Sequence, residues 1–259
     1  VFVRILGIPV VNDGVEVNMK LYDITSSYDD ILNSSSDFLK LVETEQDPVY
    51  HAEGNVWIHT TMVLDSLKQI WHELSEKEKQ ICFNACVYHD IAKSYTTIKH
   101  EDGGISARGH SNKGSSQVRT ILYKANVDKT IREQICPLVL NHQVPFFTFN
   151  SKSQEPPELI VRRLSVECDT RLLYYVAKAD MMGRTYHDKQ SVLSDIELFK
   201  ELCIEQECFG KPYAFADNIT RVKYFDSSGT IDPTYNFYRE PASTVYVMVG
   251  LPGSGKNYY

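Results

Sequence analysis

Residues 55–93 decide the fold, and they read NVWIHTTMVLDSLKQIWHELSEKEKQICFNACVYHDIAK. The first half carries a stripe at helical spacing, made of Val56, His59, Val63, Leu67 and Ile70. That spacing predicts an amphipathic helix over residues 55–74. Residues 75–78, SEKE, then form a capping box that opens a second helix, which we expect to end near residue 93. The pair His89-Asp90 is therefore expected near a helix end.

Similar periodicity predicts helices through most of the remaining chain. It begins at residue 28 and recurs over residues 110–125, 129–141, 156–168, 170–184 and 189–209. Residues 1–25 hold short apolar runs broken by the turn Asn12-Asp13-Gly14, which indicates a small β hairpin. Strands are otherwise almost absent before residue 245. The predicted fold class is mainly α, with a helical bundle over residues 1–210.

Composition excludes several classes of protein. Of the 259 residues, 42% are hydrophobic and 24% are charged, which is typical of soluble globular domains rather than disordered, collagen-like or membrane-embedded chains. The formal net charge of -7 gives the whole chain no general attraction to nucleic acid or anionic membrane. Six cysteines without a CxxC pair indicate buried free thiols in a reducing compartment. We therefore expect a cytoplasmic protein without a membrane partner, and the oligomeric state is left open.

The strongest chemical signal is a set of histidines and aspartates at or near predicted helix ends. Imidazole and carboxylate groups suit divalent metals. The candidate ligands are His59, His89, Asp90, His110, His142 and Asp180. If they converge, they can hold two adjacent ions with Asp90 as the bridge. Any one of these histidines, taken alone, is more often an ordinary hydrogen-bonded residue.

These residues occur in five segments: NVWIHT (55–60), YHDIAK (88–93), GHS (109–111), NH (141–142) and AKADMMGR (177–184). In this order the segments resemble the HD-domain metal-dependent phosphohydrolases. The resemblance implies a core ligand set of His59, His89, Asp90 and Asp180. It also implies that His110 and His142 match the extra histidines of two-metal members. One or two divalent ions would bind, drawn from manganese, iron, cobalt, nickel, zinc and magnesium.

Two cations stand one helical turn beyond ligand candidates. Lys93 follows His89, and Arg184 follows Asp180, so both can direct positive charge toward a metal-bound phosphate. Each can equally be a solvated charge at a helix C-terminus. Asp90, Lys93 and Arg184 are the predicted catalytic residues. The expected reaction is hydrolysis of a phosphate ester by metal-bound hydroxide, because a divalent ion lowers the pKa of bound water toward about 7.

The segment YHAEGNVW at residues 50–57 resembles the HD domains of bacterial tRNA nucleotidyltransferases. Its residues His51, Glu53 and Trp57 would either contact substrate or pack the loop. The two possibilities stay open at this point.

A glycine-rich motif closes the chain. Residues 250–256, GLPGSGK, fit the phosphate-binding loop GxxxxGK and follow the apolar run 245–249, a predicted strand. The predicted nucleotide-binding residues are Gly250, Gly253, Ser254, Gly255 and Lys256, with ATP and magnesium as ligands. Asn257 stands where Ser or Thr normally binds magnesium, which puts that contact in doubt. A plain glycine-rich turn is the alternative.

Residues 211–243 are rich in turn residues and aromatics, which indicates an ordered linker. Residues 244–259 would then begin a truncated α/β P-loop domain. The sequence starts without Met and stops inside the motif, so we expect that both ends are cut.

An HD domain followed by a P-loop module resembles the bacterial HD-Pnk family of RNA end-healing enzymes. The resemblance implies removal of a 2',3'-cyclic, 2'- or 3'-phosphate from RNA ends, and a missing half that would be an ATP-dependent polynucleotide 5'-kinase. Candidate RNA contacts are Arg108, Lys113 and Arg119, unless they form a solvated helix face.

Two other functions remain open. The HD domain can act on free mononucleotides or signalling nucleotides instead of RNA. Alternatively, it is a catalytically silent metal-binding sensor, although a decayed site usually loses some of its ligands and all of the candidates are present here.

Overall fold

The computed structural model describes residues 20–150 and 155–239, which are mainly helical. Most of the hairpin predicted for residues 1–25 and the whole phosphate-binding loop lie outside the described residues. The chain divides into two compact units, Val1–Tyr213 and Ala214–Tyr259. None of the helices in the described parts has the length and apolar character needed to cross a membrane.

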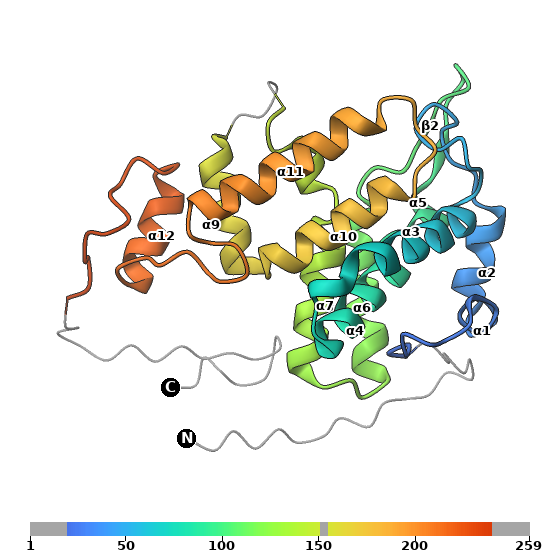
Figure 1. The fold of residues 1–259 in the computed structure, drawn as a ribbon, viewed down its shortest axis with the longest axis horizontal. Helices are drawn as coiled ribbons and strands as arrows, with labels where there is room; N and C mark the ends of the chain where they lie inside the picture. The colour runs from blue at the N-terminus through green and yellow to red at the C-terminus, as the bar shows by residue number, and fades with distance from the viewer. Residues whose placement is uncertain (1–19, 151–154, 240–259) are drawn as a thin grey trace, which may run out of the picture. The chain divides into compact units, whose positions relative to one another are not determined.

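The first unit holds the elements that carry the candidate site (Figure 1). In chain order they are α1 (Tyr28–Asn33), α2 (Ser36–Glu43), α3 (Val56–Ile70), the 3-10 turn η1 (Trp71–Glu73), α4 (Glu76–Tyr88), α5 (Lys93–Thr96), β1 (Ile98–Lys99), β2 (Ile105–Ser106), α6 (His110–Lys124), α7 (Lys129–Asn141), α8 (Val144–Phe147), α9 (Pro157–Glu167), α10 (Thr170–Met182) and α11 (Lys189–Glu205).

The predicted helix starts are confirmed by their caps. Asn55 precedes α3 and accepts the Ile58 N–H at 2.9 Å. The capping box of α4 is complete, with Glu78 accepting the Ser75 N–H at 2.8 Å and Ser75 accepting from the Glu78 backbone. Asp128 caps α7 by accepting the Thr130 N–H at 2.8 Å. These side chains satisfy amide groups that the first turn of a helix leaves without partners.

The helix predicted to reach residue 93 ends at Tyr88 instead. The His89 ring folds back, and its Nδ1 donates to the Cys86 carbonyl at 2.7 Å. A continuing α-helix would use that carbonyl for the Asp90 amide. The backbone then closes tighter turns, with the Ile91 N–H on the Tyr88 carbonyl at 3.2 Å. His89 and Asp90 therefore lie beyond the helix rather than along its side.

The long helix α11 also stops early, at Glu205 rather than at residue 209. Glu207 has a φ of 52°, and the Cys208 N–H returns to the Cys203 carbonyl at 2.8 Å. This closing turn satisfies a carbonyl of the last helical turn.

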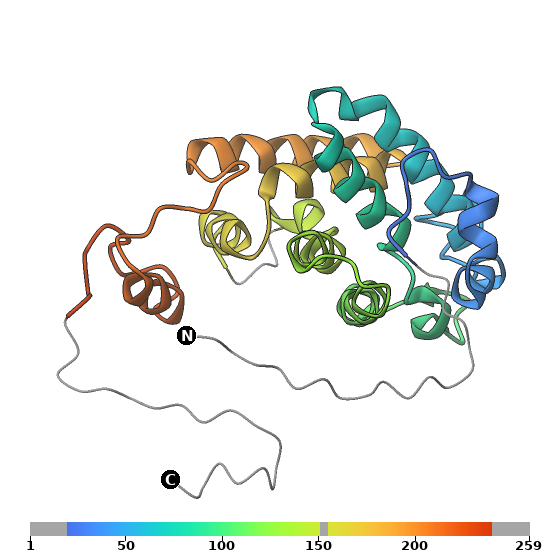
Figure 2. The same ribbon diagram turned by 90° about the horizontal axis from the view of Figure 1, so that it is seen from below.

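Helix pairs bury the core of the first unit. Helix α6 packs on α7, α3 on α10, α10 on α11, and α4 on α7. Figure 2 shows α6 and α7 end-on and side by side, in green. Leu64 of α3, Phe83 of α4 and Val176 of α10 are fully buried in one cluster. The site described below is built at the edges of these packed helices.

The chain passes very close to α3 at Gly183, which follows the last residue of α10. A Cβ atom at this position would lie 2.7 Å from the Val63 backbone nitrogen, closer than atoms can pack. Only glycine permits this contact. The close approach brings Asp180 of α10 beside His59 of α3.

A small antiparallel hairpin joins α5 to α6, pairing Ile98 with Ser106 and Lys99 with Ile105. No strand was predicted here. Gly103 takes a φ of 85° in its turn, and Gly109 takes a φ of 77° where the chain enters α6. Both are conformations that glycine adopts without strain. The second turn makes His110 the first residue of α6.

The second unit contains α12 (Asn218–Asp226), a helix in the segment expected to be a linker. Asp217 caps it by accepting the Thr220 N–H at 2.8 Å. The Phe215 ring lies 5.3 Å from the Tyr224 ring, centroid to centroid. Turn residues on both sides of α12 dominate the composition of this segment. A helix of only nine residues was therefore not predicted from the sequence. The division of the chain at residues 210 and 243 stays a prediction.

Candidate metal centre

All six predicted ligand residues are buried, and they come together in the first unit. His89 follows the last residue of α4, His142 follows the last residue of α7, and His110 opens α6. His59 and Asp180 lie on the facing helices α3 and α10, 121 residues apart in sequence, with His59 Nε2 3.1 Å from Asp180 Oδ1.

Asp90 lies at the middle of the cluster. Its Oδ2 is 3.2 Å from His89 Nε2 and 3.8 Å from His59 Nε2. Its Oδ1 is 3.2 Å from His110 Nε2 and 3.9 Å from His142 Nε2. The carboxylate thus faces two pairs of imidazoles, one pair on each oxygen.

His51, Glu53 and His59 form one group with the geometry to hold a metal ion, and two further groups overlap at Asp90. Of these two, one is His59, His89 and Asp90; the other is Asp90, His110 and His142. Within each group, the ligand atoms lie within 4.8 Å of one another. Asp90 belongs to both of the overlapping groups, which is the position required of a carboxylate that bridges two adjacent ions.

The histidine rings present their Nε2 atoms to the centre because Nδ1 is engaged. His89 Nδ1 contacts the Cys86 carbonyl at 2.7 Å, His110 Nδ1 the Ala107 carbonyl at 2.8 Å, and His142 Nδ1 the Val139 carbonyl at 2.8 Å. A carbonyl oxygen only accepts, so each Nδ1 carries a proton and the ring is oriented with Nε2 toward the centre. Metal-ligating histidines have this arrangement.

The fourth imidazole is held by a carboxylate. Glu53 Oε1 lies 3.0 Å from His59 Nδ1 in a bent contact and 2.7 Å from His51 Nδ1. Glu53 Oε2 accepts the Thr185 N–H at 2.7 Å. Burial opposes the charge on Glu53, but His51 and His59 hold the pKa of its carboxyl below the usual range. Substrate contact and loop packing were the roles expected for Glu53, and neither describes this support of a candidate ligand.

Buried groups without partners make the cluster fit a cation. Neither oxygen of Asp90, nor His89 Nε2, has a hydrogen-bond partner of good geometry among the described residues, although Lys93 Nζ lies in ion-pair distance of Asp90 Oδ2. Burial disfavours the charged form of Asp90, but His89 and Lys93 hold its pKa well below the usual range. Carboxylate oxygens and imidazole nitrogens together form a donor set that suits a divalent ion.

Burial also lowers the pKa of His142 to about 3. The ring is therefore neutral at physiological pH, which is the form that binds metals.

Asp180 is engaged by Arg184 as well as by His59. Arg184 Nε donates to Asp180 Oδ1 at 2.9 Å, and an Arg184 terminal nitrogen donates to Oδ2 at 3.0 Å. Burial opposes the charge on Asp180, yet Arg184 and His59 hold its pKa well below the usual range. The Arg184 guanidinium also lies over the Phe146 ring, 5.0 Å from its centroid. Arg184 therefore lies at the centre, as the sequence suggested, but its first partner is Asp180.

Lys93 likewise joins the centre. Its Nζ lies 2.7 Å from Asp90 Oδ2 and donates to Gln46 Oε1 at 2.8 Å. Gln46 was not predicted, and nothing in its sequence context marks it, because it reaches Lys93 from a loop 47 residues away.

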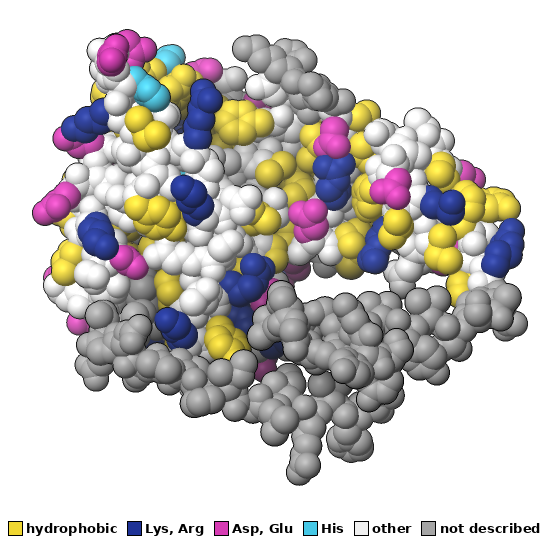
Figure 3. All heavy atoms as spheres, turned by 180° about the vertical axis from the view of Figure 1, so that it is seen from behind, with side chains coloured by type: hydrophobic (Ala, Val, Ile, Leu, Met, Phe, Trp, Pro, Cys, Tyr) yellow, Lys and Arg dark blue, Asp and Glu magenta, His cyan; other side chains and the backbone are white. Residues whose placement is uncertain are grey.

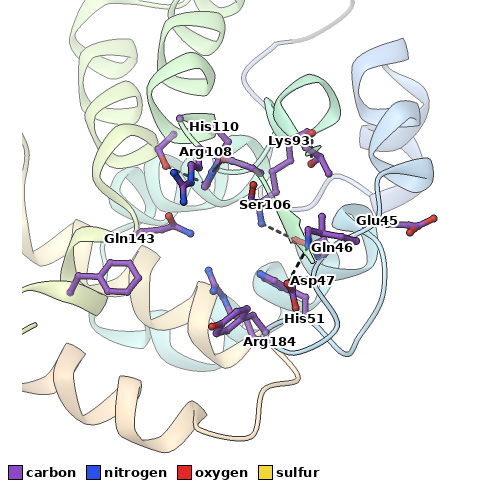
Figure 4. A pocket seen from close by; sticks show the side chains of 17 residues that line it. Glu45, Gln46, Asp47, His51, Lys93, Ser106, Arg108, His110, Gln143 and Arg184 are labelled. Carbon is purple, nitrogen blue, oxygen red and sulfur yellow. Dashed lines mark hydrogen bonds between the residues drawn. The ribbon is translucent and has the colours of Figure 1, made fainter. Parts of the chain in front are cut away.

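A pocket of about 470 Å³ opens beside the cluster. Figure 4 shows Lys93, Arg108 and Arg184 around it, together with His51 and His110. These three cations come from different parts of the chain and can meet an anion from several sides. Of the candidate RNA contacts, Arg108 lines the pocket. Lys113 lies near the Tyr95 ring and Arg119 pairs with Glu133, and neither of them lines the pocket.

Comparison with protein families agrees with this geometry. Residues 56–182 match the HD domain family. HD domains are generally metal-dependent hydrolases that bind divalent metals. The matched range contains every candidate ligand of the centre and ends two residues before Arg184. No curated relative and no solved structure matches the chain.

Proposed function

We propose that this protein is a metal-dependent phosphohydrolase that removes 2',3'-cyclic, 2'- or 3'-phosphate from RNA ends. The observation that carries the proposal is the position of Asp90, which is shared by two histidine pairs and lies beside a cation-lined pocket. The proposed ligands are His59, His89, Asp90, His110, His142 and Asp180.

A divalent ion bound there supplies activation of water and neutralisation of charge on the phosphoryl oxygens. The chain's own cations hold the substrate. Lys93 has three N–H donors and Arg184 has five, of which Asp90, Gln46 and Asp180 engage only some. The remaining donors are available to phosphate oxygens, since both residues line the pocket. No residue needs to form a covalent bond to the substrate.

An enzyme that grips only a terminus needs few phosphate contacts, which agrees with the charge distribution. Figure 3 shows Lys and Arg side chains scattered over one face and interspersed with acidic and apolar side chains, without a continuous basic stripe. The net charge of -7 has the same implication. RNA would therefore be held at its end rather than along its length.

A free nucleotide is the second candidate substrate. Glu45 and Asp47 also line the pocket, and their negative charge opposes binding of a nucleotide that carries more than one phosphate group. A substrate with one phosphate would avoid this repulsion.

The kinase half of the proposal concerns residues outside the described ranges. Gly250, Gly253, Ser254, Gly255 and Lys256 would bind ATP with magnesium, and a P-loop domain would phosphorylate RNA 5'-hydroxyl ends. This rests on the motif and its resemblance to the HD-Pnk family.

The described cysteines are all free thiols, which supports a reducing, cytoplasmic location.

The test measures phosphate release from an RNA oligonucleotide ending in 2',3'-cyclic or 3'-phosphate, and from mononucleotides, across a panel of divalent metals. Asp90→Asn keeps the shape of the side chain but removes the bridging charge, and Asp29→Asn in the exposed first turn of α1 is the matched control. We expect activity on RNA ends that disappears with a chelator and in Asp90→Asn but persists in Asp29→Asn.

Activity confined to mononucleotides would move the assignment to the second candidate. Metal binding without any hydrolysis would identify a silent sensor. Full activity of Asp90→Asn would refute the proposed centre.

A further inference from the structure

The cation-lined pocket adjoins a second pocket of about 500 Å³. The two share three lining residues, Ser111, Gln143 and Phe147. Both volumes lie in the range of small-molecule sites. A ligand that occupies the first pocket can therefore extend into the second.

The two pockets differ in charge. Lys93, Arg108 and Arg184 line the first, whereas none of the described residues that line the second is charged. Leu140, Val144 and Ile160 give the second pocket apolar walls. An anionic group therefore belongs in the first pocket, and a neutral, largely apolar group belongs in the second.

Two side chains at the shared wall have unused binding capacity. Gln143 immediately precedes α8 and Phe147 ends it, four residues later, so both can face one side of this single turn. The Phe147 side chain is exposed, at 57%. The Gln143 carboxamide makes no hydrogen bond within the described ranges, and Figure 4 shows it pointing into the first pocket from the wall that both pockets share.

A nucleobase matches this pair of groups. Its neutral face stacks on aromatic rings. Its edge carries hydrogen-bond donors and acceptors, which the NH2 group and the carbonyl oxygen of a carboxamide can pair with. We propose that the second pocket is a base pocket, in which a nucleobase of the substrate stacks on Phe147 and hydrogen-bonds to Gln143. This inference rests on the proposed function, which brings the substrate phosphate to the adjoining centre.

The base pocket predicts a specificity that depends on the base and not on the phosphate. The assay compares adenosine 3'-monophosphate, the dinucleotide ApA with a 3'-phosphate, and glycerol 2-phosphate, which lacks a base. Loss of one stacking contact should lower kcat/KM on base-containing substrates roughly ten-fold or more. We expect this from Phe147→Ala, mainly through KM, with glycerol 2-phosphate unaffected.

Phe149→Ala is the matched control, because Phe149 is an exposed phenylalanine nearby that lines neither pocket. Phe147→Tyr should retain the wild-type preference, since it keeps an aromatic face. If only the dinucleotide responds to Phe147→Ala, the pocket holds the base of the preceding nucleotide. If the mononucleotide responds as well, it holds the base of the terminal one.

Binding of adenosine, measured by NMR, separates this inference from the proposed function. If adenosine binds the wild type but not Phe147→Ala, the base pocket is supported. If the same wild-type protein hydrolyses no phosphate ester, the proposed hydrolase is refuted while the base pocket is not. Equal effects of Phe147→Ala on glycerol 2-phosphate and adenosine 3'-monophosphate, or no effect on either, would refute the base pocket and leave the hydrolase intact.

Discussion

Replacing Glu53 with glutamine should weaken metal binding, although Glu53 is not itself a proposed ligand. Both oxygens of Glu53 are engaged: Oε1 accepts from His51 and lies 3.0 Å from His59 Nδ1, and Oε2 accepts the Thr185 N–H. Glutamine has one accepting atom and one donating atom at these places. It must therefore present an NH2 group to one of the two sides.

Each orientation of the amide has a defined cost. If its oxygen faces the histidines, the NH2 group opposes the Thr185 N–H, and an unpaired donor costs about 1–3 kcal/mol of stability. If its NH2 group faces His59, Nδ1 must accept, and the proton moves to Nε2, the nitrogen that faces Asp90. Loss of such support for a ligand typically weakens metal affinity about 10–100-fold, which is about 1.4–2.8 kcal/mol.

The assay is titration of the metal-free protein with manganese or zinc in competition with a chelating dye, together with thermal denaturation. Glu76→Gln is the matched control, since the Glu76 side chain is 76% exposed on the first turn of α4. We expect Glu53→Gln to lose metal affinity and stability while Glu76→Gln keeps both. Wild-type affinity and melting temperature in Glu53→Gln would show that Glu53 does not hold His59.

Two further substitutions test the fold around the site. Gly183→Ala places a Cβ against the Val63 backbone and should lower the free energy of unfolding by about 1–3 kcal/mol in urea denaturation. Gly114→Ala, whose Cβ would meet only ordinary contacts, is its control, and equal stability of the two variants would contradict the close approach. Glu78→Gln should lose about 1 kcal/mol at pH 7, because Glu78 caps α4 and pairs with Arg171. Burial opposes the charge of Glu78, but bonds from Ser75 and Arg171 lower its pKa in the folded state, so its contribution is full at neutral pH. The stability difference from wild type should therefore shrink as pH falls through the folded-state pKa, and a difference independent of pH would contradict the assignment.

Local signals in the sequence placed three of the six ligand residues near helix ends, whereas the convergence of all six was only a condition of the metal-site hypothesis. Capping residues and apolar spacing located the ends of α4, α6 and α7 closely enough to put His89, His110 and His142 at helix ends. The order of these residues along the chain then supplied the resemblance. What the spacing could not give was the stop of α4 at Tyr88, since that stop depends on the contact between the His89 ring and the Cys86 carbonyl.

Contacts made by loops were beyond prediction. Gln46 meets Lys93 only because the segment before α3 folds over α5. Glu53 accepts a hydrogen bond from the Thr185 amide, 132 residues away in sequence, and the spacing of apolar residues cannot predict such a contact. The sequence set Glu53 apart without showing its partner. Helix α12 was missed for a related reason, because its cap Asp217 resembles an ordinary turn residue until the Thr220 amide is seen to point at it.

The carbonyl contacts of the three helix-end histidines have a consequence for how an ion enters the centre. Each ring is anchored to the backbone three residues before it, so His89, His110 and His142 lose their rotamer freedom when the helices form. Capture of an ion then requires little further ordering, and more of the binding energy is retained as affinity. Because the backbone contacts orient the rings, the fold itself favours an ion whose preferred geometry matches the positions of these nitrogens.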